Sequence, residues 1–180
     1  MQTFVYLKSL KIKIILPFIL FISSLNQLSS GEVIFTAVSR VIDGDTIEIL
    51  KADEFVKVRL HGIDAPEITQ KYGKEATDKL IELLRPANMV SVNIMDKDRY
   101  GRYIATVHAN DDDMVYVKSY GGVRGNVGLI LVDQGLAWHY KKYSDSKELE
   151  AAENYARTNK LGLWSDENPI APWEYRKHIN

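Results

Sequence analysis

The sequence predicts an α+β fold, a small β-barrel with flanking helices. After Gly31, short runs of alternating and β-branched residues follow one another, as in consecutive strands. Segments with helical spacing lie between and after these runs. The 180 residues contain no internal repeat and no low-complexity segment. We therefore expect one domain of ordinary size, with extra sequence at its ends.

The first 30 residues differ from the rest of the chain. Three lysines precede the apolar run "IILPFILFISSL", and no acidic residue stands before Glu32. A basic start, a short apolar core and the small residues "LSSG" are typical of a secretory signal peptide. An uncleaved anchor is the alternative, although the run is shorter than the roughly 20 residues that span a bilayer. We expect a signal peptide over 1–30, cleaved within 28–32, a domain over 31–180, and a secreted, periplasmic or cell-envelope location.

The composition excludes several classes of site. The chain has no cysteine, which excludes disulfides, cysteine zinc sites and thiol nucleophiles. Its 23 basic and 24 acidic residues become 20 and 24 once the first 30 residues are removed. A domain with more acidic than basic residues has no general attraction for polyanions. Contact with nucleic acid must therefore come from local cationic and aromatic side chains or from a bound cation.

The first predicted strands surround an acidic turn. Residues 33–42 and 46–50 are β-branched runs separated by "DGD" (43–45), which on its own indicates only a hairpin turn. Residues 55–63 alternate again, with aliphatic side chains on one face and Arg59 on the other. Arg59 is therefore expected to point away from the aliphatic core.

A helix and a hairpin are predicted next. Residues 74–84 have apolar side chains at helical spacing. The apolar stripe consists of Ala76, Leu80, Leu83 and Leu84. Residues 89–95 and 102–109 have the pattern of two strands joined by the polar turn "DKDRYG", and residues 114–120 that of another strand.

Two further helices and a tail complete the prediction. Residues 127–135 predict a short helix that ends with glycine at its C′ position. Residues 146–162 predict a longer helix, with Asp145 as N-cap and Gly162 at its end. The tail "ENPIAPWEYRKHIN" contains two prolines, and we expect it to cross the surface in extended form.

Acidic and cationic residues gather at the predicted strand ends. Asp45 and Asp64 lie in turns that can be adjacent in a small barrel. Their carboxylates and the main-chain carbonyl of Ala65 offer hard oxygen ligands, which calcium and magnesium prefer. Arg59 and Arg102 begin or end strands of the same sheet, and guanidinium groups bind phosphate in a bidentate manner. Zinc is not expected, because the histidines show no ligand spacing.

Six ordered segments resemble the staphylococcal-nuclease-like (thermonuclease) family. They are "VIDGDTIEI", "VRLHGIDAPE", "KYGKEA", "DRYGR", "LVDQGLAW" and "NKLGLW". The resemblance runs from about Val33 to Trp164. It implies an OB-fold, a five-stranded β-barrel with about three flanking helices, and a calcium-dependent phosphodiesterase that cuts DNA and RNA to leave 3′-phosphate ends. We expect a monomer that prefers single strands and has no stable protein partner.

The resemblance also implies roles for individual residues. Asp45 and Asp64 match the carboxylates that hold one calcium ion (Ca²⁺), and Ala65 matches a main-chain carbonyl ligand at a position often occupied by threonine. Glu67 matches the residue proposed as general base, although it is open whether it removes a proton or orients the water. Two arginines match the groups that stabilise the phosphate: Arg59 and Arg102. Four further residues match substrate-binding positions, the two tyrosines of the 140s only loosely: Arg99, Tyr100, Tyr140 and Tyr143.

Phosphodiester hydrolysis needs the same set of groups. A carboxylate that orients or deprotonates water contributes roughly 10²–10⁴-fold, a cation acts as a Lewis acid, and guanidinium groups stabilise charge on the phosphate oxygens. A non-catalytic module of the same fold, binding nucleic acid or protein, is the alternative. Such a module is expected to have lost a carboxylate or an arginine, and this chain has lost neither. Residues 111–127 exceed the compact family core and predict either an extended hairpin near the site, with Lys118 and Arg124 touching the substrate, or a surface elaboration.

Overall fold

The computed structural model describes residues 31–84, 89–109 and 125–179. The predicted signal peptide lies outside the described residues, as does most of the 111–127 segment, including the predicted strand over 114–120. Within the described part of the chain, no helix is long and apolar enough to cross a membrane.

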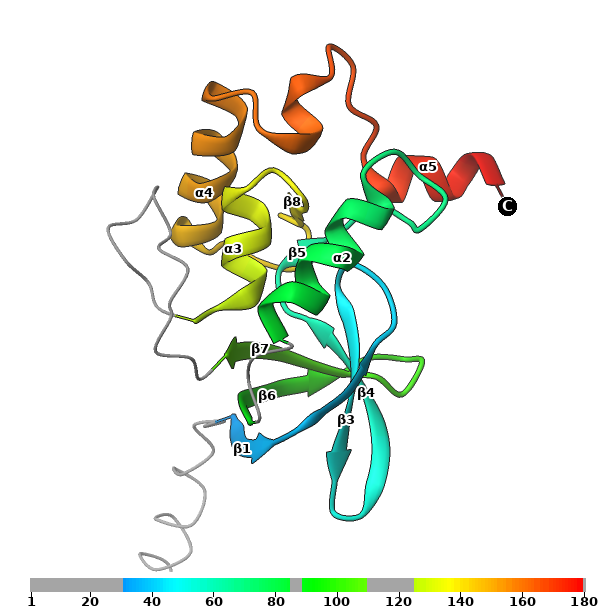
Figure 1. Ribbon diagram of the computed structural model, residues 1–180, viewed down its shortest axis with the longest axis vertical. Coiled ribbons are helices and arrows are strands. Elements are labelled where there is room, and N and C mark those ends of the chain that lie inside the picture. The colour runs from blue at the N-terminus through cyan, green and yellow to red at the C-terminus, as the bar shows by residue number, and fades with distance from the viewer. Residues whose placement is uncertain (1–30, 85–88, 110–124, 180) are drawn as a thin grey trace, which may run out of the picture. The chain divides into compact units, whose positions relative to one another are not determined.

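The predicted α+β class is confirmed, and Figure 1 shows the elements. The strands are β1 (Glu32–Thr36), β2 (Val38–Val41), β3 (Thr46–Lys51), β4 (Glu54–Leu60), β5 (Ile63–Asp64), β6 (Val90–Lys97), β7 (Tyr103–Ala109) and β8 (Trp138–His139). The helices are α2 (Gly73–Leu84), α3 (Val127–Asp133), α4 (Lys147–Thr158), the 3₁₀-helix η2 (Gly162–Ser165) and α5 (Pro172–Ile179).

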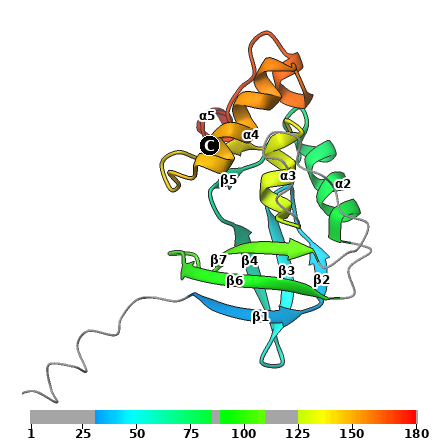
Figure 2. The ribbon, with the colours of Figure 1, turned by 90° about the vertical axis from the view of Figure 1, so that its left-hand side faces the viewer.

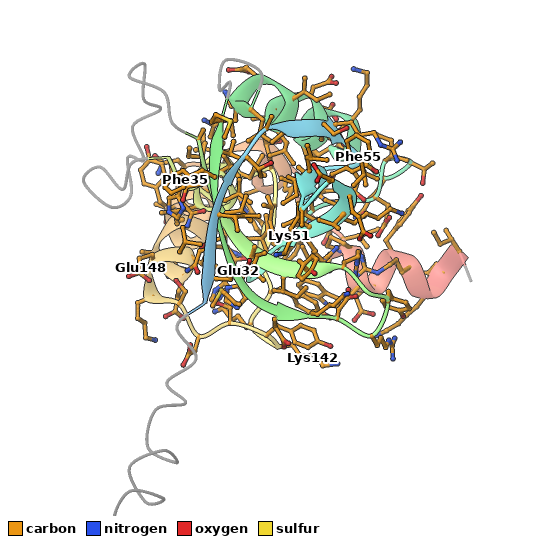
Figure 3. All side chains as sticks on the ribbon, turned by 90° about the horizontal axis from the view of Figure 1, so that it is seen from below. Glu32, Phe35, Lys51, Phe55, Lys142 and Glu148 are labelled. Atoms are coloured by element: carbon orange, nitrogen blue, oxygen red, sulfur yellow. The ribbon has the colours of Figure 1, made fainter. Side chains whose placement is uncertain are left out.

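One sheet contains six strands in the order β1-β6-β7-β4-β3-β2. Its pairs are antiparallel except for β4 and β7, which run parallel. The two end strands, β1 and β2, are consecutive in the chain and separated only by Ala37, so six strands replace the expected five because the first strand is divided there. Side chains connect β1 to β3: Glu32 pairs with Lys51 at 2.7 Å (Figure 3), and the Thr36 hydroxyl donates to the Leu50 carbonyl at 2.6 Å.

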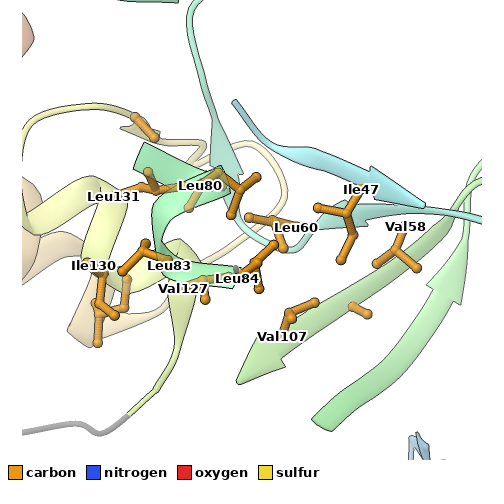
Figure 4. Packing of buried hydrophobic residues seen from close by; sticks show 14 of the residues in the cluster. Ile47, Val58, Leu60, Leu80, Leu83, Leu84, Val107, Val127, Ile130 and Leu131 are labelled. Atoms are coloured by element: carbon orange, nitrogen blue, oxygen red, sulfur yellow. The ribbon is translucent and has the colours of Figure 1, made fainter. Parts of the chain in front are cut away.

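The core lies between the sheet and the helices α2 and α3. All residues of the predicted α2 stripe are buried, which confirms the helical spacing. Figures 1 and 2 show α2, α3 and α4 gathered at one end of the sheet. In Figure 4, Leu80 and Leu84 of α2 approach Leu60 of β4, and Leu131 of α3 lies beside α2. This packing holds α2 against the strand ends where the predicted site lies.

The ends of α4 differ from the prediction. Ser146, and not Asp145, is the N-cap, and its hydroxyl accepts the main-chain N–H of Leu149 at 3.2 Å. The helix ends at Thr158, before Lys160 takes a positive φ of 52°. Serine and aspartate are about equally good caps, so the sequence alone could not choose between adjacent candidates.

The tail also differs from the prediction, because its last part is the helix α5 and not an extended segment. Pro172 occupies the first helical position, where its missing N–H costs no hydrogen bond. Glu174 lies in the first turn and basic residues in the last turn, which suits the helix dipole. These signals outweigh the two prolines, which both precede the second helical residue.

Candidate active site

Arg59, near the end of β4, holds two buried carboxylates. Its Nη1 donates to Asp45 Oδ1 at 2.7 Å and its Nη2 donates to Asp64 Oδ1 at 2.5 Å. Asp45 is 3% exposed and Asp64 is fully buried. The structure therefore brings three of the predicted site residues together around one guanidinium group.

Two glycines allow the loops of the site to approach α2 closely. A Cβ at Gly44, in the "DGD" turn, would lie 2.8 Å from the methyl groups of Ala65 and Ala76. A Cβ at Gly73, the first residue of α2, would lie 1.8 Å from the main-chain oxygen of Glu67. Any side chain at either position would therefore push the acidic loops off α2.

The main chain of Ala65 also lies against Asp45. The Ala65 N–H donates to Asp45 Oδ2 at 2.9 Å, and the Thr46 hydroxyl donates to Asp45 Oδ1 at 2.9 Å. Burial raises the pKa of Asp45 to about 7, because Arg59 offsets only part of the cost of desolvating this carboxylate and because Asp43 and Asp64 are also negative. Burial acts to lower the pKa of Arg59, but Asp45 and Asp64 outweigh it and the pKa is raised. The cluster therefore favours additional positive charge.

Arg176 of α5 supplies such a charge. Its Nη2 donates to Asp64 Oδ2 at 2.7 Å, and its Nη1 donates to Glu67 Oε1 at 2.7 Å and to Asp64 Oδ1 at 3.2 Å. Burial acts to lower the pKa of Arg176, but its bonds to the two carboxylates raise it well above the usual range. Arg176 therefore connects Glu67 to Asp45, Arg59 and Asp64. These four residues, Asp45, Arg59, Asp64 and Glu67, are here called the acid cluster.

Sequence reasoning missed Arg176, because the tail was expected to be extended. The helix signals of residues 172–178 were available in the sequence. No local pattern, however, indicates a contact between Arg176 and Asp64, which are 112 positions apart.

Arg102 lies near the start of β7 and is held by Asp98. Its Nε donates to Asp98 Oδ2 at 2.8 Å, and its Nη2 forms an ion pair with the same oxygen at 2.8 Å. Arg59 pairs with Ile104 across the parallel ladder, so Arg102, two residues earlier, is expected on the same face of the sheet as Arg59. The other two predicted residues of this turn accompany it: Arg99 Nη2 donates to the Tyr100 hydroxyl at 2.6 Å, and Arg102 lies over the Tyr100 ring at 5.7 Å.

The predicted tyrosines Tyr140 and Tyr143 contact each other, and Tyr140 also contacts α5. Their rings meet edge to face with centroids 5.0 Å apart. Tyr140 also stacks on Trp173 of α5, with centroids 5.0 Å apart and planes 5° apart. The short β5–β8 ladder pairs Asp64 with Trp138, which ties this aromatic group to the acid cluster.

The donor set fits a hard divalent cation. Asp45 and Asp64 share Arg59 as a partner, so their carboxylates converge, and the Ala65 main chain is bonded to one of them. No group of three or more histidine, aspartate or glutamate side chains able to hold a metal occurs among the described residues. Two carboxylates with main-chain and water oxygens suit calcium or magnesium better than zinc.

Comparison with known proteins agrees with this geometry. A sequence model described as "Staphylococcal nuclease homologue" matches residues 57–166, a range that includes Arg59, Asp64, Glu67 and Arg102 but neither Asp45 nor Arg176. The chain is 39% identical over 161 residues to an "Uncharacterized endonuclease" of Escherichia coli, covering 89% of this chain and 95% of that protein. It is 38% identical over 167 residues to an "Uncharacterized endonuclease" of Haemophilus influenzae, with coverage of 92% and 85%. It is 36% identical over 151 residues to the "Micrococcal nuclease" of Shigella flexneri, with coverage of 82% and 80%.

Proposed function

Because this chain belongs to the staphylococcal nuclease family, whose domain is an OB-fold, we propose that it is an endonuclease that hydrolyses phosphodiester bonds of nucleic acids. The observation that carries this function is the acid cluster, in which Arg59 bonds to two buried carboxylates and Arg176 connects one of them to the partly exposed Glu67. A binding module would have no need for carboxylates that are costly to bury.

The cation proposed for this site is one Ca²⁺ ion. Asp45, Asp64 and the Ala65 carbonyl would hold it, and when bound it would supply Lewis-acid polarisation of a phosphate oxygen. Two carboxylates of the chain then hold the ion, which leaves the third, Glu67, to act on water.

The remaining residues act directly on water and phosphate. The Glu67 side chain is 36% exposed, so its carboxylate can reach a solvent water and orient or deprotonate it. Arg59 uses one N–H of each terminal nitrogen for the acids and keeps other donors for a phosphate oxygen. Arg102 approaches from the β6–β7 turn as the second guanidinium, and both stabilise the charge that develops on the phosphate.

We propose DNA and RNA as substrates, a preference for single strands, and 3′-phosphate products. The aromatic side chains of Tyr100, Tyr140 and Tyr143 support contact with unpaired bases, because base stacking needs exposed rings and Tyr100 and Tyr143 are exposed. The protein is proposed to act as a monomer with no stable protein partner.

The first experiment is cleavage of denatured DNA by residues 31–180 with calcium, with magnesium and with a calcium chelator. We expect calcium-dependent cutting to 3′-phosphate ends, reduced by at least about 10²-fold in Glu67→Gln, the scale of one general base, and in Arg102→Ala, the scale of one lost electrostatic donor. Matched controls are Glu54→Gln and Arg40→Ala, which remove the same charges from exposed positions on β4 and β2.

Folded wild-type protein that does not cut with either cation would contradict the enzymatic function and favour the binding module. Cutting that survives both site variants would show that these residues do not carry the activity.

The location is proposed to be secreted, periplasmic or envelope-bound, supported by the lysine-rich and apolar pattern of residues 1–30. Expression of the full chain is expected to yield an exported product whose first residue lies within 28–32. N-terminal sequencing of the exported product tests this, and full-length protein retained in the membrane fraction would indicate an uncleaved anchor.

A further inference from the structure

Two side chains of α5 occupy parts of the proposed active site. Trp173 and Arg176 are three residues apart, so they lie on the same face of the helix. Arg176 bonds to the acid cluster and Trp173 stacks on Tyr140. Figure 1 shows α5 beside the segment that leads into α2.

Arg176 occupies both oxygens of Asp64. Oδ2 accepts from Arg176 Nη2 at 2.7 Å, and Oδ1 accepts from Arg176 Nη1 at 3.2 Å and from Arg59 Nη2 at 2.5 Å. A divalent cation that takes Asp64 as a ligand would lie beside these two guanidinium groups, and the repulsion between the positive charges favours the loss of one guanidinium bond. Arg59 comes from the sheet and is 17% exposed, whereas the Arg176 side chain is 34% exposed and is the easier of the two to move.

Apart from Trp173, which stacks on Tyr140 and meets Trp138 edge to face with centroids 5.4 Å apart, α5 is held mainly by polar contacts. Among the described residues of α5, only Pro172 is buried. The Tyr175 hydroxyl lies 3.2 Å from the Thr69 hydroxyl, an exposed contact, and the Gln70 side chain donates to the Ile170 carbonyl just before the helix. A helix of eight residues has little stability by itself. The docking of α5 therefore depends strongly on Arg176 and Trp173.

We propose that Arg176 and the divalent cation compete for Asp64, so that α5 is a cap which the cation releases from the site. This inference rests on the proposed function, because it takes Asp45 and Asp64 as the cation ligands. When the cation binds, Arg176 leaves Asp64 and Glu67, and Trp173 separates from Tyr140. The same event frees the carboxylate that acts on water and uncovers an aromatic ring for a base.

Calcium affinity tests the competition without any measurement of cleavage. Calorimetric titration of residues 31–180 with Ca²⁺ is expected to show binding that is tighter in Arg176→Gln than in the wild type, within the range of roughly 5–150-fold that is typical of coupled sites. The matched control is Lys177→Gln, which removes the same charge from the same helix at a residue bonded to Glu174. The control is expected to change the affinity less than about twofold, since an exposed charge outside the cluster is screened.

The wild-type protein supplies a second readout that needs no change at Arg176. Addition of Ca²⁺ is expected to alter the tryptophan emission, because Trp173 leaves its stacked position, and the change is expected to be absent in Trp173→Phe. Arg176→Lys keeps the charge but cannot bond both oxygens of Asp64 as a planar fork, so its calcium affinity is expected to fall between those of the wild type and Arg176→Gln.

Equal or weaker calcium binding in Arg176→Gln would overturn the competition and make Arg176 a fixed part of the site. Emission that does not respond to saturating Ca²⁺ would overturn the release of α5. A failure of the proposed nuclease function can be distinguished from both of these results. If no form of the protein cuts nucleic acid while the affinity shift is present, the proposed function is wrong and the competition is right. If the protein cuts in the presence of calcium but Arg176→Gln does not bind calcium more tightly, the proposed function is right and the competition is wrong.

Discussion

Arg59 is a structural residue as well as a proposed catalytic one. Its replacement by alanine leaves Asp45 and Asp64 buried without their shared partner. We expect Arg59→Ala to lower the free energy of unfolding by about 3–5 kcal/mol in the presence of chelator, the usual cost of breaking a buried ion pair. Arg102→Ala is expected to cost about 1 kcal/mol or less, because its pair with Asp98 is partly exposed. Urea denaturation of both variants measures the difference.

Calcium provides the control for this prediction. A cation that binds the two carboxylates stabilises the folded state by mass action, so excess Ca²⁺ is expected to recover part of the stability lost in Arg59→Ala. Equal destabilisation by the two substitutions would contradict the structural role of Arg59.

Residue chemistry made much of the site predictable. The carboxylates, the proline turn and Arg59 lie within a short stretch, and the alternation in β4 placed Arg59 opposite the aliphatic side chains, as the structure shows. The catalytic and metal-binding roles of these residues stay predictions. The contacts of Arg176 were not predictable in the same way, because its partners lie 109 and 112 positions earlier in the chain and only tertiary packing brings them together.

Among the secondary-structure elements, the turn between β6 and β7 is stabilised by hydrogen bonds to Asp98. Its carboxylate accepts the N–H groups of Tyr100 and Arg102, each at 2.9 Å, in addition to the Arg102 guanidinium. Burial acts to raise the pKa of Asp98, but the hydrogen bonds from Arg102 and Tyr100 outweigh it and the pKa is lowered. A carboxylate with a lowered pKa in the folded state stabilises the protein above its unfolded pKa, and this stabilisation is lost as the pH falls through the folded pKa.

We therefore expect Asp98→Ala to cost about 1–2 kcal/mol at pH 7, as for hydrogen bonds to a charged group. The difference from the wild type is expected to shrink as the pH falls below about 4, near the unfolded pKa of aspartate. Urea denaturation at both pH values checks the trend, and a difference that grows at low pH would contradict the role of the ionised carboxylate.

The N-cap of α4 also leads to a prediction about stability. Ser146→Ala is expected to lower the free energy of unfolding by about 1 kcal/mol, because the Leu149 N–H loses its acceptor. Asp145→Ala, at the residue first expected to cap the helix, is expected to cost only a few tenths of a kcal/mol, the usual cost at a surface position. Thermal denaturation of the two neighbouring variants compares them directly, and a larger effect at Asp145 would restore it as the cap.

Helices with strong hydrophobic periodicity were predicted correctly, whereas the boundaries of α4 and the C-terminal helix α5 were not. The apolar stripe of α2 and the glycine after α3 indicated these helices correctly, because burial against the sheet follows the same spacing. The boundaries of α4 and the helix α5 depend on capping and on contacts with distant residues. The local signals for α5 were present in residues 172–178, but no local pattern indicates its contacts with distant residues or decides between adjacent caps of α4.

For the whole molecule, charge predicts how substrate binding depends on cation. The domain over 31–180 has 20 basic and 24 acidic residues, so its net charge repels a polyanion. Denatured DNA is therefore expected to bind at least about tenfold more weakly with chelator than with calcium, because the cation reverses the local field at the acid cluster. Filter binding with Glu67→Gln, in which cleavage during the measurement is expected to be slow, tests this, and equal affinities under both conditions would contradict it.

The division of the first strand at Ala37 has a consequence for folding order. β2 can pair with β3 as soon as a short hairpin has formed, but Glu32 of β1 pairs with Ile94 of β6, which lies 62 positions later. Closing so long a loop is slow, because its entropy is lost before the strand contacts form. Until β6 arrives, β1 is an unpaired edge that can associate with another chain. Refolding from denaturant is therefore expected to have a late step at this edge and a yield that falls as the protein concentration rises.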